Sequence, residues 1–203
     1  MKTKTNKYKM GMSIIEIIFS LAILSLIALA FTMFSRNIFF YGNFVGSGLE
    51  NVDAGRKIIK ELTAELRTAS TADTGAYVIS SASASALTFY SDTDGDGLKE
   101  RVRYFLNGTS LQKGTIKPTG SPLTYNALNE KITTLVYNVR SSSIFSYYDE
   151  NYDGTTSPLS FPVTISSIRM IKLSLEIDRD LNHSPVPITF TTQVSIRNLK
   201  DNL

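Results

Sequence analysis

The longest apolar run of the chain lies close to its beginning. Residues 17–35, IIFSLAILSLIALAFTMFS, form an uncharged run of 19 residues. An α-helix needs about 20 apolar residues to cross the hydrocarbon layer of a bilayer. The run therefore predicts a membrane-spanning helix.

A second helical pattern follows the apolar run. Apolar side chains recur there at steps of three or four, with one longer step, at Leu49, Val52, Ile59, Leu62, Leu66 and Ala69. This spacing is typical of an amphipathic helix. Because the first proline is Pro118, one continuous helix from about residue 13 to about residue 68 is expected. Gly42, Gly46 and Gly48 are the positions where it would bend or melt.

Beyond residue 69 the hydrophobic period changes from helical to two. A short strand is predicted at 76–79, and strands at 87–90 and 100–106 flank the turn sequence DTDGDG. Residues 131–140 and 144–148 are predicted as a second strand pair. Residues 168–177 and 188–196 are predicted as a third, with 178–187 as its turn. The C-terminal half is thus expected to form one antiparallel sheet.

These elements predict an α+β fold. A long N-terminal helix, whose inner half spans the membrane, is followed only by strands, so the sheet has to bury its apolar face against the helix. The predicted parts are a leader (1–11), a transmembrane helix (12–35), the amphipathic outer half of the stem helix (36–69) and a β-rich head (70–203).

The charge pattern orients the predicted membrane helix. The chain has 21 Lys and Arg against 18 Asp and Glu, and Lys2, Lys4, Lys7 and Lys9 precede the apolar run. Basic residues stay on the cytoplasmic side, so the N-terminus is expected inside and the head outside. Without these lysines 17 basic residues face 18 acidic ones, and this balance does not support nucleic-acid binding by bulk charge.

Glu16 stands at the edge of the apolar run, where a carboxylate without a partner is costly. The surrounding sequence, KMGMSIIEIIFSLAIL, resembles the cleavage and methylation motif of type IV pilin-like proteins, with Met12 where phenylalanine is usual. The resemblance implies that a prepilin peptidase cuts between Gly11 and Met12, that the new amine is methylated, and that Glu16 faces the amine of a neighbouring subunit. A plain signal anchor is the alternative. Arg36 and three aromatic residues after the apolar run argue against cleavage of a secretory signal peptide there.

The resemblance also implies a function and partners. The chain would be a structural minor subunit of a type IV pilus or of a type II secretion pseudopilus. Other pilin or pseudopilin subunits, the peptidase and an inner-membrane assembly platform would be its partners. It would begin as a single-pass inner-membrane protein and end in a periplasmic or extracellular filament. The rival hypothesis is a tethered binding protein that never polymerises.

Two acidic loops match the first half of a calcium-binding loop, D-x-[DN]-x-[DN]-G. The first has Asp92, Asp94, Asp96 and Gly97, with Glu100 at the ninth place, and the second has Asp149, Asn151, Asp153 and Gly154. Alternate oxygen ligands around a glycine suit calcium, although the glutamate usual at the twelfth place is missing from both. Hairpin turns prefer the same residues, so a plain turn is the alternative reading. No cofactor is required, and calcium is the candidate.

We do not expect an enzyme. The chain has no cysteine, and His183 is the only histidine, in a polar turn before Pro185. A membrane-anchored hydrolase would have to rest on this residue. The aromatic cluster Tyr137, Phe145, Tyr147, Tyr148 and Tyr152 is expected to place about half of its members in the core rather than on a ligand-binding surface.

Overall fold

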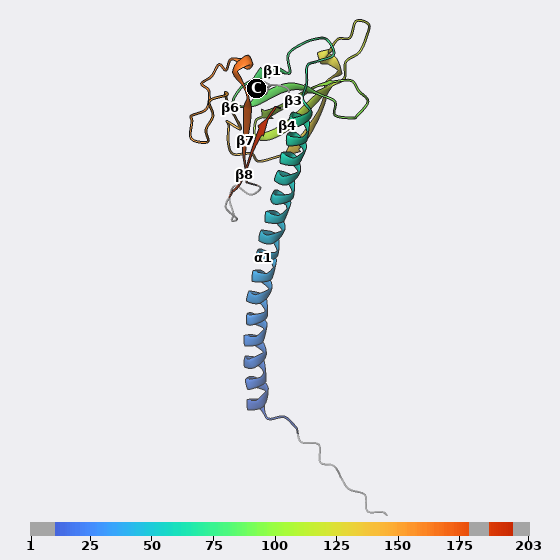
Figure 1. The fold of residues 1–203 in the computed structure, drawn as a ribbon. Helices are drawn as coiled ribbons and strands as arrows, with labels where there is room; N and C mark the ends of the chain where they lie inside the picture. The colour runs from blue at the N-terminus through green and yellow to red at the C-terminus, as the bar shows by residue number, and fades with distance from the viewer. Residues whose placement is uncertain (1–10, 179–186, 197–203) are drawn as a thin grey trace, which may run out of the picture. The chain divides into compact units, whose positions relative to one another are not determined.

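The computed structural model describes residues 11–178 and 187–196, apart from the side chains of 43–51. Its fold is α+β, as predicted. Helix α1 (Ile14–Thr68) is followed by strands and two single-turn helices, η1 (Ala127–Asn129) and η2 (Ile165–Ser167) (Figure 1). Two compact units, Met1–Gly46 and Ser47–Leu203, meet within α1, and each is described by itself below.

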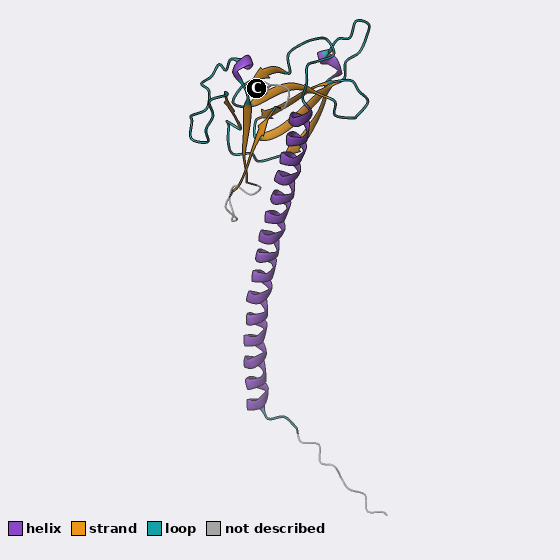
Figure 2. Ribbon diagram, in the orientation of Figure 1, coloured by secondary structure: helices purple, strands orange, loops and turns teal. Residues whose placement is uncertain are grey.

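The strands of Ser47–Leu203 form two antiparallel sheets, drawn in orange in Figure 2. The five-stranded sheet has the order β1-β2-β3-β4-β5, and the three-stranded sheet has the order β6-β7-β8. Their bounds are β1 Ile79–Ala82, β2 Ala86–Ser91, β3 Glu100–Asn107, β4 Ser110–Ile116, β5 Lys131–Val136, β6 Phe145–Tyr148, β7 Met170–Ile177 and β8 Ile188–Ser195.

The long helix and two of the predicted hairpins are confirmed. α1 agrees closely with the predicted 13–68 and remains helical through Gly42, Gly46 and Gly48. Strand β2 pairs with β3 across the DTDGDG turn, and β7 pairs with β8. The turn predicted at 178–187 lies almost wholly outside the described residues.

Several details of the predicted sheet were wrong. There are two sheets rather than one, and the short strand begins at Ile79 instead of ending there. The pair predicted from 131–140 and 144–148 does not form, because β5 pairs with β4 and β6 pairs with β7. Asn138 has φ 60°, a left-handed conformation that ends the extended run after Val136. The predicted ten-residue strand is therefore shorter.

Strand β4 was not predicted, and its glycine explains why. Its sequence SLQKGTI has a weak apolar alternation, and glycine is unfavourable inside a strand. A Cβ on Gly114 would overlap the carboxylate of Glu130. That carboxylate accepts two hydrogen bonds from Arg103, the residue opposite Gly114 on β3. Glycine thus leaves room for a partly buried ion pair.

One core joins the last turns of α1 to both sheets. Ile58, Leu62 and Leu66 of α1 are buried in a single cluster that also contains Phe89 of β2 and Leu173 of β7. Leu62 and Leu66 belong to the predicted apolar face, whereas Ile59 is only half-buried and Ile58 takes the core position. The remaining large members include Leu87, Val102, Tyr104, Leu111, Ile144, Phe145, Tyr147, Ile171, Leu175 and Ile177.

A polar contact crosses the same interface between helix and sheet. Lys113 of β4 donates to Glu61 at 2.7 Å and also to Glu65, and Tyr104 of β3 donates its hydroxyl proton to Glu65 at 2.8 Å. Burial raises the pKa of Glu65 above its ordinary range, against the opposing effect of Lys113. Burial alone would lower the pKa of Lys113, but its bonds to Glu61 and Glu65 outweigh burial and raise it. This cluster fixes the turn of α1 that faces β3 and β4.

α1 and β8 approach each other closely at Gly55, since a Cβ there would overlap the ring of Phe190. Replacing an interior helical glycine with alanine ordinarily gains about 1 kcal/mol. We predict that Gly55→Ala instead lowers the free energy of unfolding by about 1–2 kcal/mol, because overpacking costs more than the helix gains. Urea unfolding of the full chain in detergent micelles measures the change. Lys57→Ala, at an exposed position of the same turn, should be nearly neutral. Gly55→Ala in a Phe190→Ala background should recover the helix gain, and a loss that is unchanged in that background would contradict the packing explanation.

Among the described residues, Lys113 is the only cation that forms an ion pair with Glu65. We predict that Lys113→Met lowers the free energy of unfolding at pH 7 by about 2–4 kcal/mol, because a buried carboxylate is left unpaired. The side chains of Lys113 and Glu65 are 13% and 12% exposed, so solvent screens them little.

The effect of Lys113→Met should depend on pH in a defined direction. The pKa of Glu65 is raised in the folded protein. Lowering the pH from 7 toward 4.5, the ordinary pKa of a glutamate, therefore protonates Glu65 in the folded variant before it protonates Glu65 in the unfolded chain. This protonation reduces the loss of unfolding free energy. The raised pKa of Lys113 keeps the wild-type contact intact below 10.5, and the contact weakens as the pH rises through the folded value. Unfolding of both proteins at pH 5, 7 and 10 checks this, with Lys131→Met, exposed on β5, as the control. The loss should be smaller at pH 5 than at pH 7, and at pH 10, where Lys113 is still charged, it should equal the loss at pH 7. A loss that is equal at pH 5 and pH 7 would show that lost packing, not the unpaired charge, is responsible.

Candidate functional site

The first half of α1 exposes an apolar surface over its whole length. Ile14–Gly42 is long and apolar enough to cross a membrane, and no part of it is buried. Its large side chains, among them Ile14, Phe19, Leu26 and Phe31, are all exposed. An exposed apolar patch of this size on a folded protein marks a surface that a membrane or another protein covers. The segment is therefore a candidate membrane anchor or signal sequence.

Glu16 lies in the first turn of α1, and the predicted processing residues Gly11 and Met12 come before the helix begins. The backbone of the turn is closed by bonds from the amides of Glu16 and Ile17 to the carbonyl of Ser13. A carboxylate in the first turn is favoured by the helix dipole. The side chain of Glu16 is exposed and has no ion pair among the described residues.

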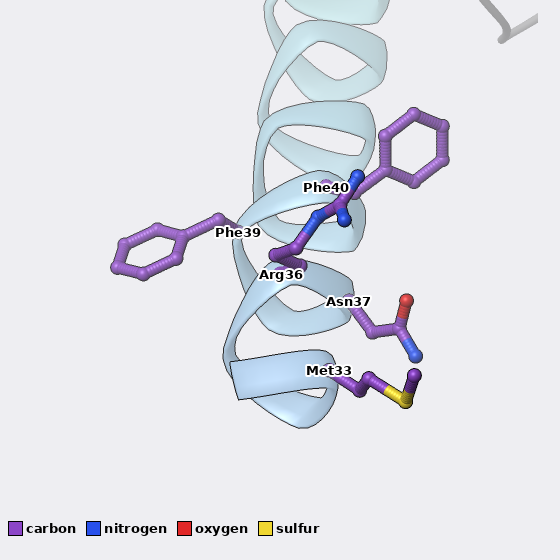
Figure 3. Close-up of a pocket in the computed structure, with 5 residues that line it drawn as sticks. All are labelled: Met33, Arg36, Asn37, Phe39 and Phe40. Atoms are coloured by element: carbon purple, nitrogen blue, oxygen red, sulfur yellow. The ribbon is translucent and has the colours of Figure 1, made fainter. Parts of the chain in front are cut away.

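Arg36 and two aromatic residues follow the apolar core of the segment. The side chains of Met33, Arg36, Asn37, Phe39 and Phe40 point in different directions from one stretch of helix, as Figure 3 shows. The space between them is an open surface of a single helix and not an enclosed ligand cavity. Aromatic rings beside a basic residue are typical of the membrane–water interface. This composition suits one end of a membrane-spanning segment.

The first acidic loop connects β2 to β3 and is ordered by its own carboxylates. Asp92 accepts the amides of Gly95 at 2.7 Å and Gly97 at 3.0 Å. Asp96 accepts the amide of Leu98, and Asp94 accepts that of Asp96. Both glycines have positive φ, 77° and 92°, which other residues rarely adopt. The loop is thus wound tightly around its carboxylates.

Glu100 is buried beneath this loop at the start of β3. It is 2% exposed, and its Oε2 accepts the amide of Thr93 at 2.8 Å and the hydroxyl of Thr93 at 2.9 Å. Its Oε1 is buried and has no hydrogen-bond partner among the described residues. One carboxylate oxygen from each of Asp92, Asp94 and Glu100 lies within 4.8 Å of the others. The structure thus brings together three of the four residues predicted as calcium ligands in this loop.

Lys117, directly after β4, reaches the open side of the same loop. Its Nζ lies 3.0 Å from Oδ2 of Asp94 and also pairs with Asp96. Bonds to Asp96 and Asp94 raise the pKa of Lys117, and the bond to Lys117 lowers the pKa of Asp96. Sequence analysis missed this contact, because it depends on the pairing of β4, which was not predicted. Tyr125 adds a second neighbour, donating its hydroxyl proton to the carbonyl of Lys99 at 2.7 Å. Burial raises the pKa of Tyr125 to about 12.

The second acidic loop has a different arrangement. Oδ1 of Asp153 accepts the amides and hydroxyls of both Thr155 and Thr156, which lowers the pKa of Asp153. Asp149 accepts the amide of Asn151 at 3.0 Å. These are contacts of a self-contained turn. Calcium binding at Asp149, Asn151 and Asp153 stays a prediction.

The other sequence predictions have mixed outcomes. Of the aromatic cluster, Phe145, Tyr147 and Tyr148 are buried, whereas Tyr152 is half-buried and Tyr137 is exposed, which agrees with the expected division. His183 lies outside the described residues.

Comparisons of the chain with models of protein families and with curated proteins found no match. The likeness to type IV pilin-like proteins therefore rests on the motif of residues 9–24 and on the order of the elements.

Proposed function

We propose that this protein is a structural subunit of a filament of the type IV pilin kind, and not an enzyme. The observation that carries the proposal is the exposed apolar helix Ile14–Gly42, which bears one carboxylate in its first turn and belongs to a chain whose remaining elements form an α+β unit. A filament needs this combination, because the apolar helix can leave the bilayer only if other copies cover it.

The processing step is supported by the position of the Gly11–Met12 bond. Residues 11–13 lie outside any helix or strand and are exposed, so a membrane peptidase can reach the backbone there. Cleavage would place a positive amine at Met12, four residues before Glu16. That amine, presented by a neighbouring subunit, would neutralise Glu16 in an apolar setting where an unpaired charge is costly. The pair would set the axial register, and packing between helices would supply most of the association energy.

Before assembly the subunit would be held in the inner membrane with its N-terminus in the cytoplasm and the β-rich unit exported. Arg36 and the aromatic residues that follow it would lie at the outer interface. Its partners would be other pilin-like or pseudopilin subunits, the prepilin peptidase and the inner-membrane assembly platform. The partner subunits determine whether the filament is a type IV pilus or a type II secretion pseudopilus. In either filament, the proposed role is that of a minor subunit.

Processing is tested on protein purified from its native membrane. We predict that mass spectrometry finds a mature chain that begins at N-methylated Met12, and that Gly11→Ala retains the leader. The larger alanine side chain would obstruct a peptidase that accepts only glycine at the cut. If the wild-type protein still carries Met1, the proposal fails, and a tethered binding protein that does not polymerise takes its place.

Assembly is tested separately through Glu16. We predict that Glu16→Gln is processed normally but enters sheared filaments at least tenfold less than wild type, because the amide cannot neutralise the neighbouring amine. Asp53→Asn is the matched control, since Asp53 is an exposed acid of the same helix outside the apolar segment. Quantitative immunoblotting of the filament and membrane fractions gives the ratio. Equal incorporation of Glu16→Gln and wild type would overturn the role of the charge pair while leaving the processing result intact.

A further inference from the structure

The β2–β3 loop of the exported unit has the composition of a cation site. Asp92, Asp94, Asp96 and Glu100 place four carboxylates within nine residues. Three of them hold oxygen atoms within 4.8 Å of one another. Like charges at this spacing repel one another unless a cation lies between them. Many acidic turns on protein surfaces tolerate such repulsion in water, so proximity alone does not establish a site.

Glu100 provides the second, independent observation. It is almost wholly buried, and its Oε1 has no hydrogen-bond partner among the described residues. An unsatisfied buried carboxylate oxygen carries a desolvation cost of roughly 1–3 kcal/mol or more. Anchoring Thr93 needs only one acceptor oxygen, which a threonine or asparagine at position 100 would also supply. The buried second oxygen is explained if a cation completes its coordination.

The ligand chemistry favours calcium. All the available ligands are oxygens, and they include several carboxylates, which suit the adaptable coordination of calcium better than the stricter octahedron of magnesium. The carboxylates stand at the first, third and fifth places of the loop, and Glu100 stands at the ninth. The missing twelfth-place glutamate reduces the ligand number, so affinity in the range of extracellular calcium modules, Kd about 10⁻⁴–10⁻³ M, is expected.

Lys117 adds a feature that a simple calcium loop lacks. Its ammonium group contacts Asp94 and Asp96 from a strand end more than twenty residues away. A lysine there partly neutralises the loop without metal, and it must leave these carboxylates before a divalent ion can bind both of them.

We propose that the β2–β3 loop binds calcium through Asp92, Asp94, Asp96 and Glu100, and that Lys117 is a built-in competitor that the ion displaces. The loop would thus have two alternative states: without calcium, Lys117 at the end of β4 pairs with Asp94 and Asp96, and with calcium, the ion takes its place. The site is independent of filament assembly, and either proposal can fail without the other.

Calcium binding can be measured on the full chain in detergent micelles after treatment with a chelator. We expect isothermal titration with CaCl₂ to show one site, and MgCl₂ to bind at least tenfold more weakly.

Terbium offers a spectroscopic probe, because the protein has no tryptophan and Tyr125 contacts the loop backbone. Tyrosine-sensitised terbium emission should appear on titration and should be displaced by calcium. Tyr125→Phe should keep the calcium affinity and reduce the emission, because phenylalanine absorbs weakly and at shorter wavelength than tyrosine, and Tyr125→Leu should reduce the emission likewise.

Three variants separate the proposal from its alternatives. Glu100→Gln and Asp94→Asn should each weaken calcium binding at least tenfold, while Asp149→Asn, in the second acidic loop, should leave it unchanged. Because Glu100→Gln can also disturb folding, circular dichroism must first show a native spectrum, and Asp94→Asn at an exposed position provides the variant that folding does not confound.

Lys117→Met should strengthen calcium binding three- to tenfold by removing the competitor. Lys99→Met is the matched control, because the Lys99 ammonium contacts the carbonyl of Gly97 and, among the described residues, no carboxylate. If both lysine variants strengthen binding equally, bulk charge is responsible and displacement of Lys117 is refuted. If wild type shows no calcium-dependent heat and no terbium emission up to 10 mM ion, the site itself is refuted.

Discussion

Both sheets of Ser47–Leu203 depend on the last four turns of α1 for their core. A three-stranded and a five-stranded antiparallel sheet each have an apolar side that needs a cover, and Ile58, Leu62 and Leu66 lie in the cluster that joins them. The Glu65 contact with Lys113 and Tyr104 adds direction to this packing, since apolar contacts alone tolerate rotation of a helix about its axis. Gly55 allows the helix to come close to β8. The helix is therefore as much a part of the β-rich unit as its strands are.

The same helix has two different surfaces along its length. Residues of Ile14–Gly42 are exposed on every side, whereas the residues near its C-terminal end bury one face and expose the other. A helix that is apolar all round needs an apolar surrounding, and a helix with one apolar face needs a folded partner. The sequence of α1 satisfies both needs in turn, which is the physical basis for the proposal that its first part lies in a membrane and is later covered by other subunits.

The sequence predicted the elements that have strong local patterns and missed those set by tertiary contacts. The uncharged run, the amphipathic spacing around Leu62 and the DTDGDG turn are local, so α1 and the β2–β3 hairpin were predicted closely. Strand β4 was missed because it contains Gly114. This glycine leaves room for the Arg103–Glu130 ion pair, a tertiary contact that no local sequence pattern reveals. Once β4 was missing, the pairing of β5 and β6 was assigned wrongly. The acidic cluster could be predicted from spacing, but its contact with Lys117 could not, because Lys117 reaches the loop only through that pairing.

Glu16 and Glu100 both lack an ion pair among the described residues, and their surroundings suit different partners. Glu16 is exposed on an apolar helix, and the partner that we propose for it is the amine of a neighbouring copy that covers this helix. Glu100 is buried under a loop of three further carboxylates, so a single amine cannot contact all of them. Lys117 reaches only the two outer ones. A small divalent ion can lie among the oxygens of Asp92, Asp94 and Glu100, which is why we propose a metal for the loop and a second subunit for the helix.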